Sequence, residues 1–230
     1  MKLTQQHINQ LYQFTRQHYV EHFDVQTELV DHLANDIEQI WEQNPSISFE
    51  QARDISFKKF GVFGFMDVVE KKQKQMNKKY LKIIFGFVKE WFSIPKIILT
   101  LSLCYTFYLL LSLPFANYIF TSFYFTLIII EFIMIFKKRK QLKNKFKKTQ
   151  KKWMLEEIIQ AQGLGNIALL SFYIFHFLTP DSYTDLSLFA NIIIAFSSTL
   201  LVIVGYITLI VIPKKSEEIL ETHYPEYKLV

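Results

Sequence analysis

The fold is decided around one basic stretch, residues 137–152, which reads KKRKQLKNKFKKTQKK. Ten of these sixteen residues are Lys or Arg, and an apolar segment lies on each side. Residues 97–136 contain one carboxylate, Glu131, and residues 158–213 contain two Asp and one His; neither segment contains Lys or Arg. Because short basic loops stay on the cytoplasmic side of a membrane, the pattern predicts a cytoplasmic loop between two membrane hairpins.

The distribution of charge also bears on the class of protein. The 230 residues suffice for one or two domains, and half of them are apolar, including 23 Phe. The net charge is +5, but the central stretch alone contributes ten positive charges. This segregation indicates an integral membrane protein with a separate polar part. The single cysteine, Cys104, excludes an internal disulfide framework, and the polar start of the chain predicts no signal peptide.

Basic residues beside membrane spans usually contact anionic lipid headgroups, each contributing about 1 kcal/mol near the surface. Nucleic-acid binding is the alternative for such a stretch. It is less favoured because the stretch is tethered at both ends and contains a single aromatic residue, Phe146. No direct nucleic-acid contact is therefore expected. The predicted headgroup-binding residues are Lys137, Lys138, Arg139, Lys140, Lys143, Lys145, Lys147 and Lys148.

The predicted fold is all-α, with a small cytoplasmic helical domain before a four-helix transmembrane region. Spans are expected from residue 95 or 96 to 113, and over 119–136, 158–178 and 186–212, with exterior loops at 114–118 and 179–185 that lack Lys and Arg. Both termini are then cytoplasmic, and the location is the inner membrane. Trp91 and Trp153 are expected at the inner interface. The predicted division is 1–75 helical domain, 76–96 juxtamembrane basic amphipathic helix, 97–136 first hairpin, 137–157 basic loop, 158–213 second hairpin and 214–230 tail.

Four helices are predicted in the amino-terminal part. Apolar residues at helical spacing predict helices over residues 4–23 and 25–43, the second with Asp24 as its N-cap. Ser48 followed by Gln51 has the form of a capping box, which opens a third helix that ends at Gly61. A fourth helix begins near Phe65 and carries many lysines.

Three short motifs in this part carry a family resemblance: Glu28-Leu-Val-Asp31-His32-Leu, Ser48-Phe-Glu50-Gln-Ala52 and Lys59-Phe60-Gly61. Residues 11–70 thereby resemble the HAAS-type helical domain, a cytoplasmic module fused to membrane spans and often encoded beside PadR-like transcription regulators. The chain departs from that family after Gly61, where Val62-Phe63-Gly64-Phe65 replaces a polar residue and Pro. The resemblance implies regulation or signalling at the membrane, with a PadR-like regulator or a larger membrane assembly as partner.

One helix face of this domain is a candidate site. Glu28, His32 and Asp36 are four residues apart, so they share a face. A metal site would need a further ligand from His7, His18 or His22, and a solvated or partner-binding face is the preferred interpretation. No metal and no cofactor is therefore expected. The predicted partner-binding residues are Glu28, Asp31, His32, Phe63, Phe65 and Val68.

Polar residues inside the spans form the second candidate set. Glu131 is expected near the inner interface, where it snorkels or pairs with a lysine, and the functional alternative is a proton or cation site. Asn191, Ser198 and Gly205 lie on one face of the last span, where small and weakly polar residues serve close helix packing or a partner's span.

No catalytic triad, phosphate-binding glycine loop or zinc spacing is present in the sequence. The leading hypothesis is a non-enzymatic membrane protein whose cytoplasmic helical domain docks a protein partner. A small transporter or channel-like subunit that uses Glu131 is one alternative. A membrane enzyme is the other, because residues 216–227 resemble the ends of some isoprenylcysteine-type methyltransferases.

Overall fold

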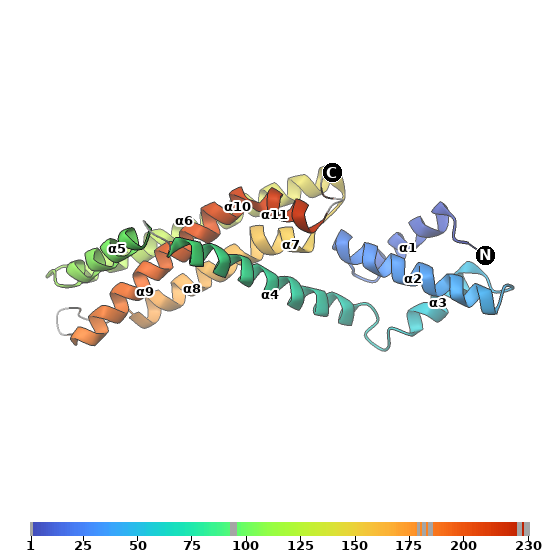
Figure 1. The fold of residues 1–230 in the computed structure, drawn as a ribbon, viewed down its shortest axis with the longest axis horizontal. Coiled ribbons are helices and arrows are strands. Elements are labelled where there is room, and N and C mark those ends of the chain that lie inside the picture. The colour runs from blue at the N-terminus through green and yellow to red at the C-terminus, as the bar shows by residue number, and fades with distance from the viewer. Residues whose placement is uncertain are drawn as a thin grey trace. The chain divides into compact units, whose positions relative to one another are not determined.

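The computed structural model describes residues 2–92, 96–178, 180, 183, 186–224 and 227, without the side chains of residues 164 and 178. The regular structure within this part is entirely helical, which confirms the predicted class (Figure 1). The helices are α1 Gln5–Gln17, α2 Phe23–Gln43, α3 Phe49–Lys58, α4 Met66–Trp91, α5 Lys96–Leu111, α6 Ala116–Thr149, α7 Met154–Glu157, the π-helix η1 Ile158–Gln162, α8 Gly163–Leu178, α9 Leu188–Tyr206, the π-helix η2 Ile207–Val211, α10 Ile212–Lys214 and α11 Ser216–His223.

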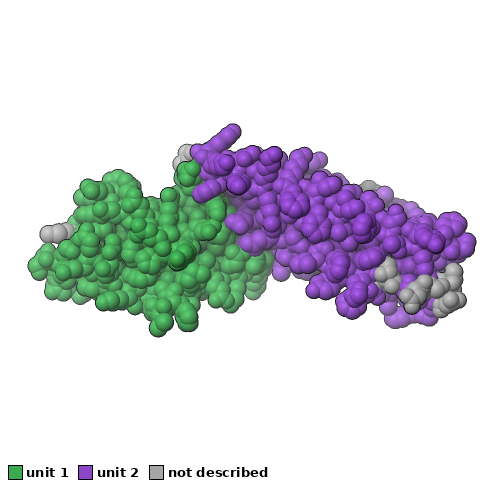
Figure 2. All heavy atoms as spheres, turned by 180° about the vertical axis from the view of Figure 1, so that it is seen from behind, with its two compact units in different colours: residues 1–78, 149–155 green, residues 79–148, 156–230 purple. Residues whose placement is uncertain are grey.

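The chain divides into two compact units, coloured separately in Figure 2. Unit 1 contains residues 1–78 and also the short segment 149–155. Unit 2 contains residues 79–148 and 156–230. The end of the basic stretch therefore belongs to the amino-terminal unit, which the sequence analysis does not anticipate.

The core of unit 1 forms where α1 packs against α2 and α2 against α3. Its centre consists of apolar side chains spaced three or four residues apart, so that each helix turns one stripe inward. Burying each large apolar side chain contributes about 1.5–3 kcal/mol. Its deeply buried members include Leu11, Val25, Leu29, Leu33, Ile37 and Ala52.

Local signals set the ends of these helices. Ser48 and Gln51 form the predicted capping box, with reciprocal hydrogen bonds of 3.3 and 3.2 Å. The chain leaves α3 just before Gly61, which has a φ of +79°. The first helix is shorter than predicted, because Tyr19 adopts a φ of +64° and ends the helical path. Asp24 lies inside the first turn of α2 and is not its N-cap.

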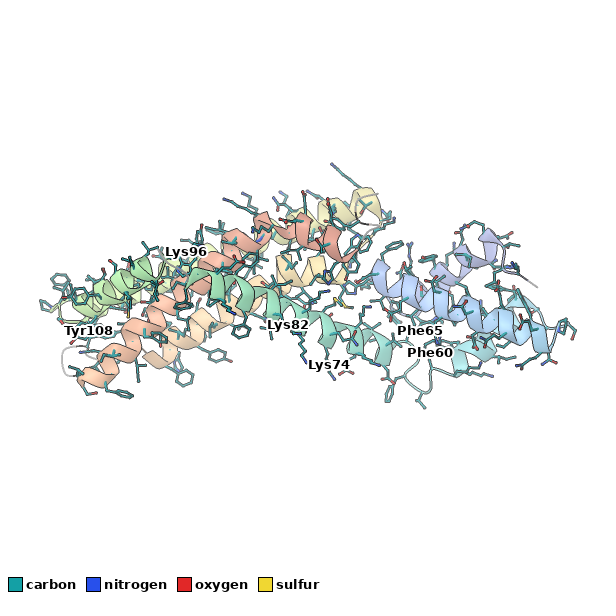
Figure 3. All side chains as sticks on the ribbon, in the orientation of Figure 1. Phe60, Phe65, Lys74, Lys82, Lys96 and Tyr108 are labelled. Carbon is teal, nitrogen blue, oxygen red and sulfur yellow. The ribbon has the colours of Figure 1, made fainter. Side chains whose placement is uncertain are left out.

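The turn between α3 and α4 corrects one predicted site residue. Phe65 is only 1% exposed, and its ring lies 4.9 Å from that of Phe60 (Figure 3). It also packs edge-on against Phe57. Gly64, at a φ of +54°, redirects the chain between Phe63 and Phe65. Phe65 is therefore a core residue, and the expectation that it lies on a binding surface is wrong.

The segment 149–155 is seated on the first turn of α2. The Phe23 N–H donates a 2.6 Å hydrogen bond to the Lys152 carbonyl. The Phe23 ring meets Trp153 edge-on at 5.4 Å, and Trp153 is 1% exposed. Lys152 forms an ion pair with Glu21. Trp153 is therefore a buried packing residue of unit 1, and its expected place at a membrane interface is corrected.

Unit 2 carries the apolar helices. Among the described residues, three helical stretches are long and apolar enough to cross a membrane: Ala116–Thr149, Met154–Phe177 and Leu188–Lys214. A fourth is obtained if α4 and α5, which meet at a 90° bend, count as one broken span. By itself α5 has 16 residues, a rise of about 24 Å against a hydrocarbon thickness of about 30 Å. Of the four predicted spans, the structure thus supports three as candidates, and a fourth only if this bent pair is one span.

The basic stretch is not a loop over most of its length. Helix α6 continues through it to Thr149. Lys, Arg and Gln are good helix formers, and residues 137–149 contain neither Gly nor Pro, so nothing stops the helix where the apolar segment ends. The predicted exterior loop 179–185 lies outside the described residues except for residues 180 and 183.

Four helices share the core of unit 2, because α5, α6, α8 and α9 all contribute buried residues to one cluster. The same helices turn large apolar side chains outward, among them Leu101 at 64% and Ile133 at 61% exposure. Outward apolar faces of this kind suit a hydrocarbon solvent. The cluster contains Phe107, Leu111, Ala116, Phe120, Tyr124, Ile167, Tyr183, Ile194, Ala195 and Leu201.

Candidate functional site

One face of α6 carries a ladder of polar residues at intervals of seven. The members are Asn117, Tyr124, Glu131, Lys138 and Lys145. Seven residues make nearly two helical turns, so these side chains follow one another along the same side of the helix. Asn117 accepts a 3.2 Å hydrogen bond from the backbone N–H of Tyr183. The apolar segment of α6 therefore has a polar inner edge.

Glu131 is the only carboxylate of that segment, and it is 1% exposed. Its Oε1 lies 2.7 Å from Ser171 Oγ on α8. Its Oε2 is buried and has no hydrogen-bond partner in the described part of the chain. The expected pairing with a lysine near the interface is replaced by a buried contact between two helices. Ser171 has no distinguishing signal in the sequence, so no pattern predicts its contact with Glu131.

Tyr124 forms the matching contact two turns away. Its hydroxyl lies 2.7 Å from Ser198 Oγ on α9, and both side chains are fully buried. Ser198 Oγ donates a 2.7 Å hydrogen bond to the Ile194 carbonyl. Ser171 Oγ likewise lies 3.0 Å from the Ile167 carbonyl. The two contacts therefore have the same arrangement. In each, a side chain of α6 contacts a serine hydroxyl that is also close to the backbone carbonyl four residues earlier in its own helix.

The neighbours of the Glu131 contact include a π-helical segment. Ile135 follows Glu131 by one turn, and Ala168 precedes Ser171 by one turn. These two buried residues form a small cluster with Leu209 of η2. Single π turns inside α-helices occur frequently at functional sites.

The basic end of α6 carries one predicted lipid-contact residue, Lys145, that is paired with a carboxylate of the protein. Lys145 Nζ lies 2.8 Å from Glu156 Oε1 and 4.2 Å from the centre of the Tyr227 ring. Tyr227 donates a 2.9 Å hydrogen bond to the same carboxylate oxygen. Burial, together with the Glu156 charge, raises the pKa of the Tyr227 phenol. Lys145 is thus paired with a buried carboxylate, while its own side chain is 35% exposed. Of the other predicted headgroup contacts, Lys138 is half-buried, and the exposed ones are Lys137, Arg139, Lys140, Lys143, Lys147 and Lys148.

The predicted polar face of α9 points into unit 2. Ser198 meets Tyr124, and Asn191 is half-buried with its Oδ1 buried. Gly205 is buried, but a Cβ added there would meet no atom within 4 Å. A close helix contact occurs instead at Gly163, where an added Cβ would lie 2.5 Å from Tyr80 Cζ of α4. The assignment of close packing to Gly205 is corrected on this ground.

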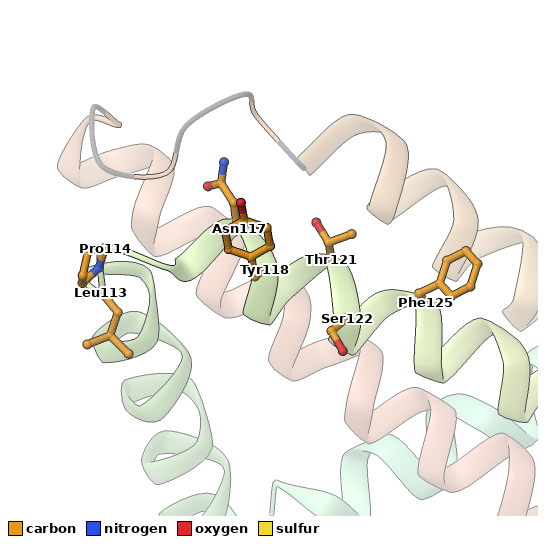
Figure 4. A pocket seen from close by; sticks show the side chains of 7 residues that line it. All are labelled: Leu113, Pro114, Asn117, Tyr118, Thr121, Ser122 and Phe125. Atoms are coloured by element: carbon orange, nitrogen blue, oxygen red, sulfur yellow. The ribbon is translucent and has the colours of Figure 1, made fainter.

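A hollow of about 640 Å³ lies at the turn between α5 and α6 (Figure 4). All its lining residues come from that turn and the first part of α6, and none of them is charged. The amide oxygen of Asn117 is already bonded to Tyr183. The hollow therefore lacks convergent polar groups that would define a ligand. Its lining residues are Leu113, Pro114, Asn117, Tyr118, Thr121, Ser122 and Phe125.

In unit 1, the structure brings together two of the six predicted partner-binding residues. Glu28 of α2 and Val68 of α4 line a hollow of about 270 Å³, and Glu28 forms a 2.5 Å ion pair with Lys72. Asp31 and His32 are exposed on the same helix as Glu28. The His32 ring meets Phe60 edge-on at 5.6 Å, which links this helix to the turn before α4.

Three exposed apolar residues of unit 1 lie in that same turn, while Tyr19 and Ile55 are exposed elsewhere in the unit. Val62 is 98% exposed, Phe63 is 71% exposed and Met66 is 50% exposed. The Val62 and Met66 exposures are not anticipated from the sequence, because it does not reveal the direction of the turn. Together with Phe63 they form an apolar prominence, defined here as Val62, Phe63 and Met66.

The metal alternative finds no support in the described residues, where no group of three or more His, Cys, Asp or Glu could hold an ion. Asp36, one of the residues considered, is bonded to Lys59 at 2.5 Å.

The chain matches no protein-family model, no curated protein and no solved structure. The class of protein therefore rests on the helical fold and its apolar helices alone. The chain is all-helical over its described part and has three or four helices that could cross a membrane.

Proposed function

We propose that this chain is a non-enzymatic membrane protein whose amino-terminal unit docks a protein partner at the membrane surface. The observation that carries the proposal is the apolar prominence of unit 1. Two large apolar side chains more than two-thirds exposed, adjacent in one turn, are unusual on a polar helical unit, and contiguous apolar patches mark interaction sites. The prominence lies between the end of α3 and the first residue of α4, outside the three single-helix candidate spans.

Charged residues of α2 and α4 would provide specificity. Glu28 and Asp31 lie on α2, and Lys71 and Lys72 line the same hollow as Glu28 on α4. Mixed charges at the rim of an apolar contact steer association and select partners more than they add affinity. The partner is a regulator of the PadR-like kind or a larger membrane assembly, as the resemblance of residues 11–70 implies.

The proposal includes an orientation. Basic residues lie before residue 97, in the central stretch and after residue 213, and none lies in the segments between. The positive-inside rule then places unit 1, the basic end of α6 and the tail in the cytoplasm, with the apolar helices in the inner membrane. The exposed lysines of α6 meet anionic headgroups there.

Copurification from native membranes in mild detergent tests the proposal. Phe63→Ser should abolish recovery of the partner, because it removes the largest side chain of the prominence. Ile55→Ser is the matched control, since Ile55 is an exposed apolar residue of α3 outside the prominence, at 42% exposure. Equal recovery with both variants, at equal membrane insertion, would refute docking at this surface. Asp31→Lys should weaken recovery in a salt-dependent manner.

A further inference from the structure

The hydrogen-bond donors and acceptors around Glu131 support an inference that is independent of partner docking. Ser171 Oγ lies within hydrogen-bonding distance of two acceptors, Glu131 Oε1 at 2.7 Å and the Ile167 carbonyl at 3.0 Å. A serine hydroxyl has one hydrogen to donate. Both contacts are full hydrogen bonds only if Glu131 carries a proton and donates it to Ser171 Oγ, while Ser171 donates to Ile167.

The Tyr124 contact shows the same arrangement with a group that is always protonated near neutral pH. The Tyr124 hydroxyl can donate to Ser198 Oγ, and Ser198 donates to the Ile194 carbonyl. The two serines occupy equivalent roles on α8 and α9. A protonated Glu131 makes the two contacts chemically equivalent, whereas an ionised Glu131 does not.

The surroundings of Glu131 also favour the neutral acid. A carboxylate out of water is costly unless it is paired. Ser171 is the hydrogen-bonding partner of Glu131, and an apolar cluster of Ile135, Ala168 and Leu209 begins one helical turn from these two residues. The nearest basic residues along α6, Lys137 and Lys138, lie beyond the apolar segment. Burying Oε2 without a hydrogen bond costs little free energy when it is the carbonyl oxygen of a protonated acid. The cost is much larger when it shares the negative charge of a carboxylate.

We propose that Glu131 and Ser171 form a proton-binding site within the membrane part. The site holds one proton on Glu131 Oε1 in this conformation, and that proton makes the hydrogen bond between α6 and α8. Loss of the proton leaves Ser171 with two competing acceptors and a buried charge, which loosens the contact between the two helices. The ligand of the site is the proton itself.

Infrared spectroscopy of the full-length protein in lipid nanodiscs at neutral pH tests this directly. The wild type should show the C=O stretching band of a protonated carboxylic acid, shifted on exchange into D₂O, and Glu131→Gln should remove it. Ser171→Ala should shift the band without removing it, because the acid remains buried but loses its acceptor. Glu156→Gln is the control and should leave the band unchanged, since Glu156 is paired with Lys145.

Two results would overturn the proposal. Identical acid bands in the wild type and Glu131→Gln would show that Glu131 is ionised. A band that Na⁺ or K⁺ removes at constant pH would show that the site takes a metal cation in preference to a proton. If Glu131→Gln does not assemble, the Ser171→Ala shift and the D₂O shift of the wild-type band still decide between an acid and a carboxylate.

Discussion

Asp24 Oδ1 on α2 accepts a 3.2 Å hydrogen bond from the backbone N–H of Met154, across 130 residues of sequence. With the Phe23 to Lys152 bond, this contact fixes the segment 149–155 on unit 1. The sequence assigns Asp24 to a helix cap, but the carboxylate serves a distant backbone group. Met154 is 0% exposed, so no solvent could take the place of the Asp24 carboxylate as acceptor for its N–H.

The first prediction concerns the hydrogen bond between Asp24 and Met154. Asp24→Ala should expose the segment to trypsin after Lys151 and Lys152, because an unsatisfied buried N–H costs about 1–3 kcal/mol. Since about 1.4 kcal/mol corresponds to a factor of ten, cleavage of the full-length protein should accelerate about tenfold. Asp24→Asn retains an oxygen acceptor and should be cleaved nearly as slowly as the wild type. Unchanged cleavage of Asp24→Ala would mean that the bond does not hold the segment.

The second prediction concerns the pH dependence of the Asp36–Lys59 pair. Burial opposes ionisation of Asp36, but the hydrogen bond and the positive charge of Lys59 favour it, and the pKa of the carboxyl is lowered. Stabilisation is therefore present above the ordinary Asp pKa of about 4 and is lost as the pH falls through the lowered value.

Asp36→Asn measures that stabilisation. The lysine is largely exposed, so the substitution should reduce the free energy of local opening at pH 7 by about 0.5 kcal/mol. Hydrogen exchange of the α2 and α3 amides should show the difference at pH 7 and its disappearance in strong acid. A difference that persists or grows in acid would contradict the assigned pair. Asp31→Asn, an exposed carboxylate on the same helix, is the control.

The third prediction compares two glycines of unit 2. Gly163→Ala should lower the thermal stability in detergent, because the new methyl group overlaps the Tyr80 ring. Gly205→Ala should be neutral or should stabilise the helix by up to about 1 kcal/mol, because its Cβ meets open space. The opposite order of the two melting temperatures would contradict the packing described for α4 and α8.

The fourth prediction concerns orientation in the membrane. In a Cys104→Ala background, Ser112→Cys in the turn after α5 should react with a membrane-impermeant maleimide on intact cells. Lys143→Cys should react only after permeabilisation, because the basic end of α6 is proposed to be cytoplasmic. Both positions are exposed in the structure. Labelling of Lys143→Cys on intact cells would invert the proposed topology.

Local chemistry made part of this fold predictable. The Ser48–Gln51 capping box and the Gly61 turn depend on neighbours within a few residues, and the structure contains both. The apolar stripe of α2 is periodic, and Leu29, Leu33 and Ile37 are buried as this spacing predicts. The apolar membrane helices follow from composition and length.

The rest depends on geometry that spacing does not encode. Phe63 and Phe65 are the same residue type in one short apolar segment, so the sequence does not distinguish them. The positive φ of Gly64 sets the direction of the chain between them, which leaves Phe63 exposed and Phe65 buried. Ser171 lies in an apolar helix without polar periodicity, so its contact with Glu131 depends on how α8 is rotated against α6. Trp153 has the residue type of an interfacial anchor, but the contacts of its neighbours with α2 place it in unit 1.

Site-specific photo-crosslinking in native membranes tests the central claim, partner docking at the prominence, most directly. A photoreactive phenylalanine analogue at position 63 should give a discrete product heavier than the full-length chain, and the same analogue at position 55 should not. The product at position 63 should weaken when Glu28→Lys reverses the charge at the hollow between α2 and α4. The account would be contradicted by identical products at positions 63 and 55, or by products at position 63 that consist of lipid alone.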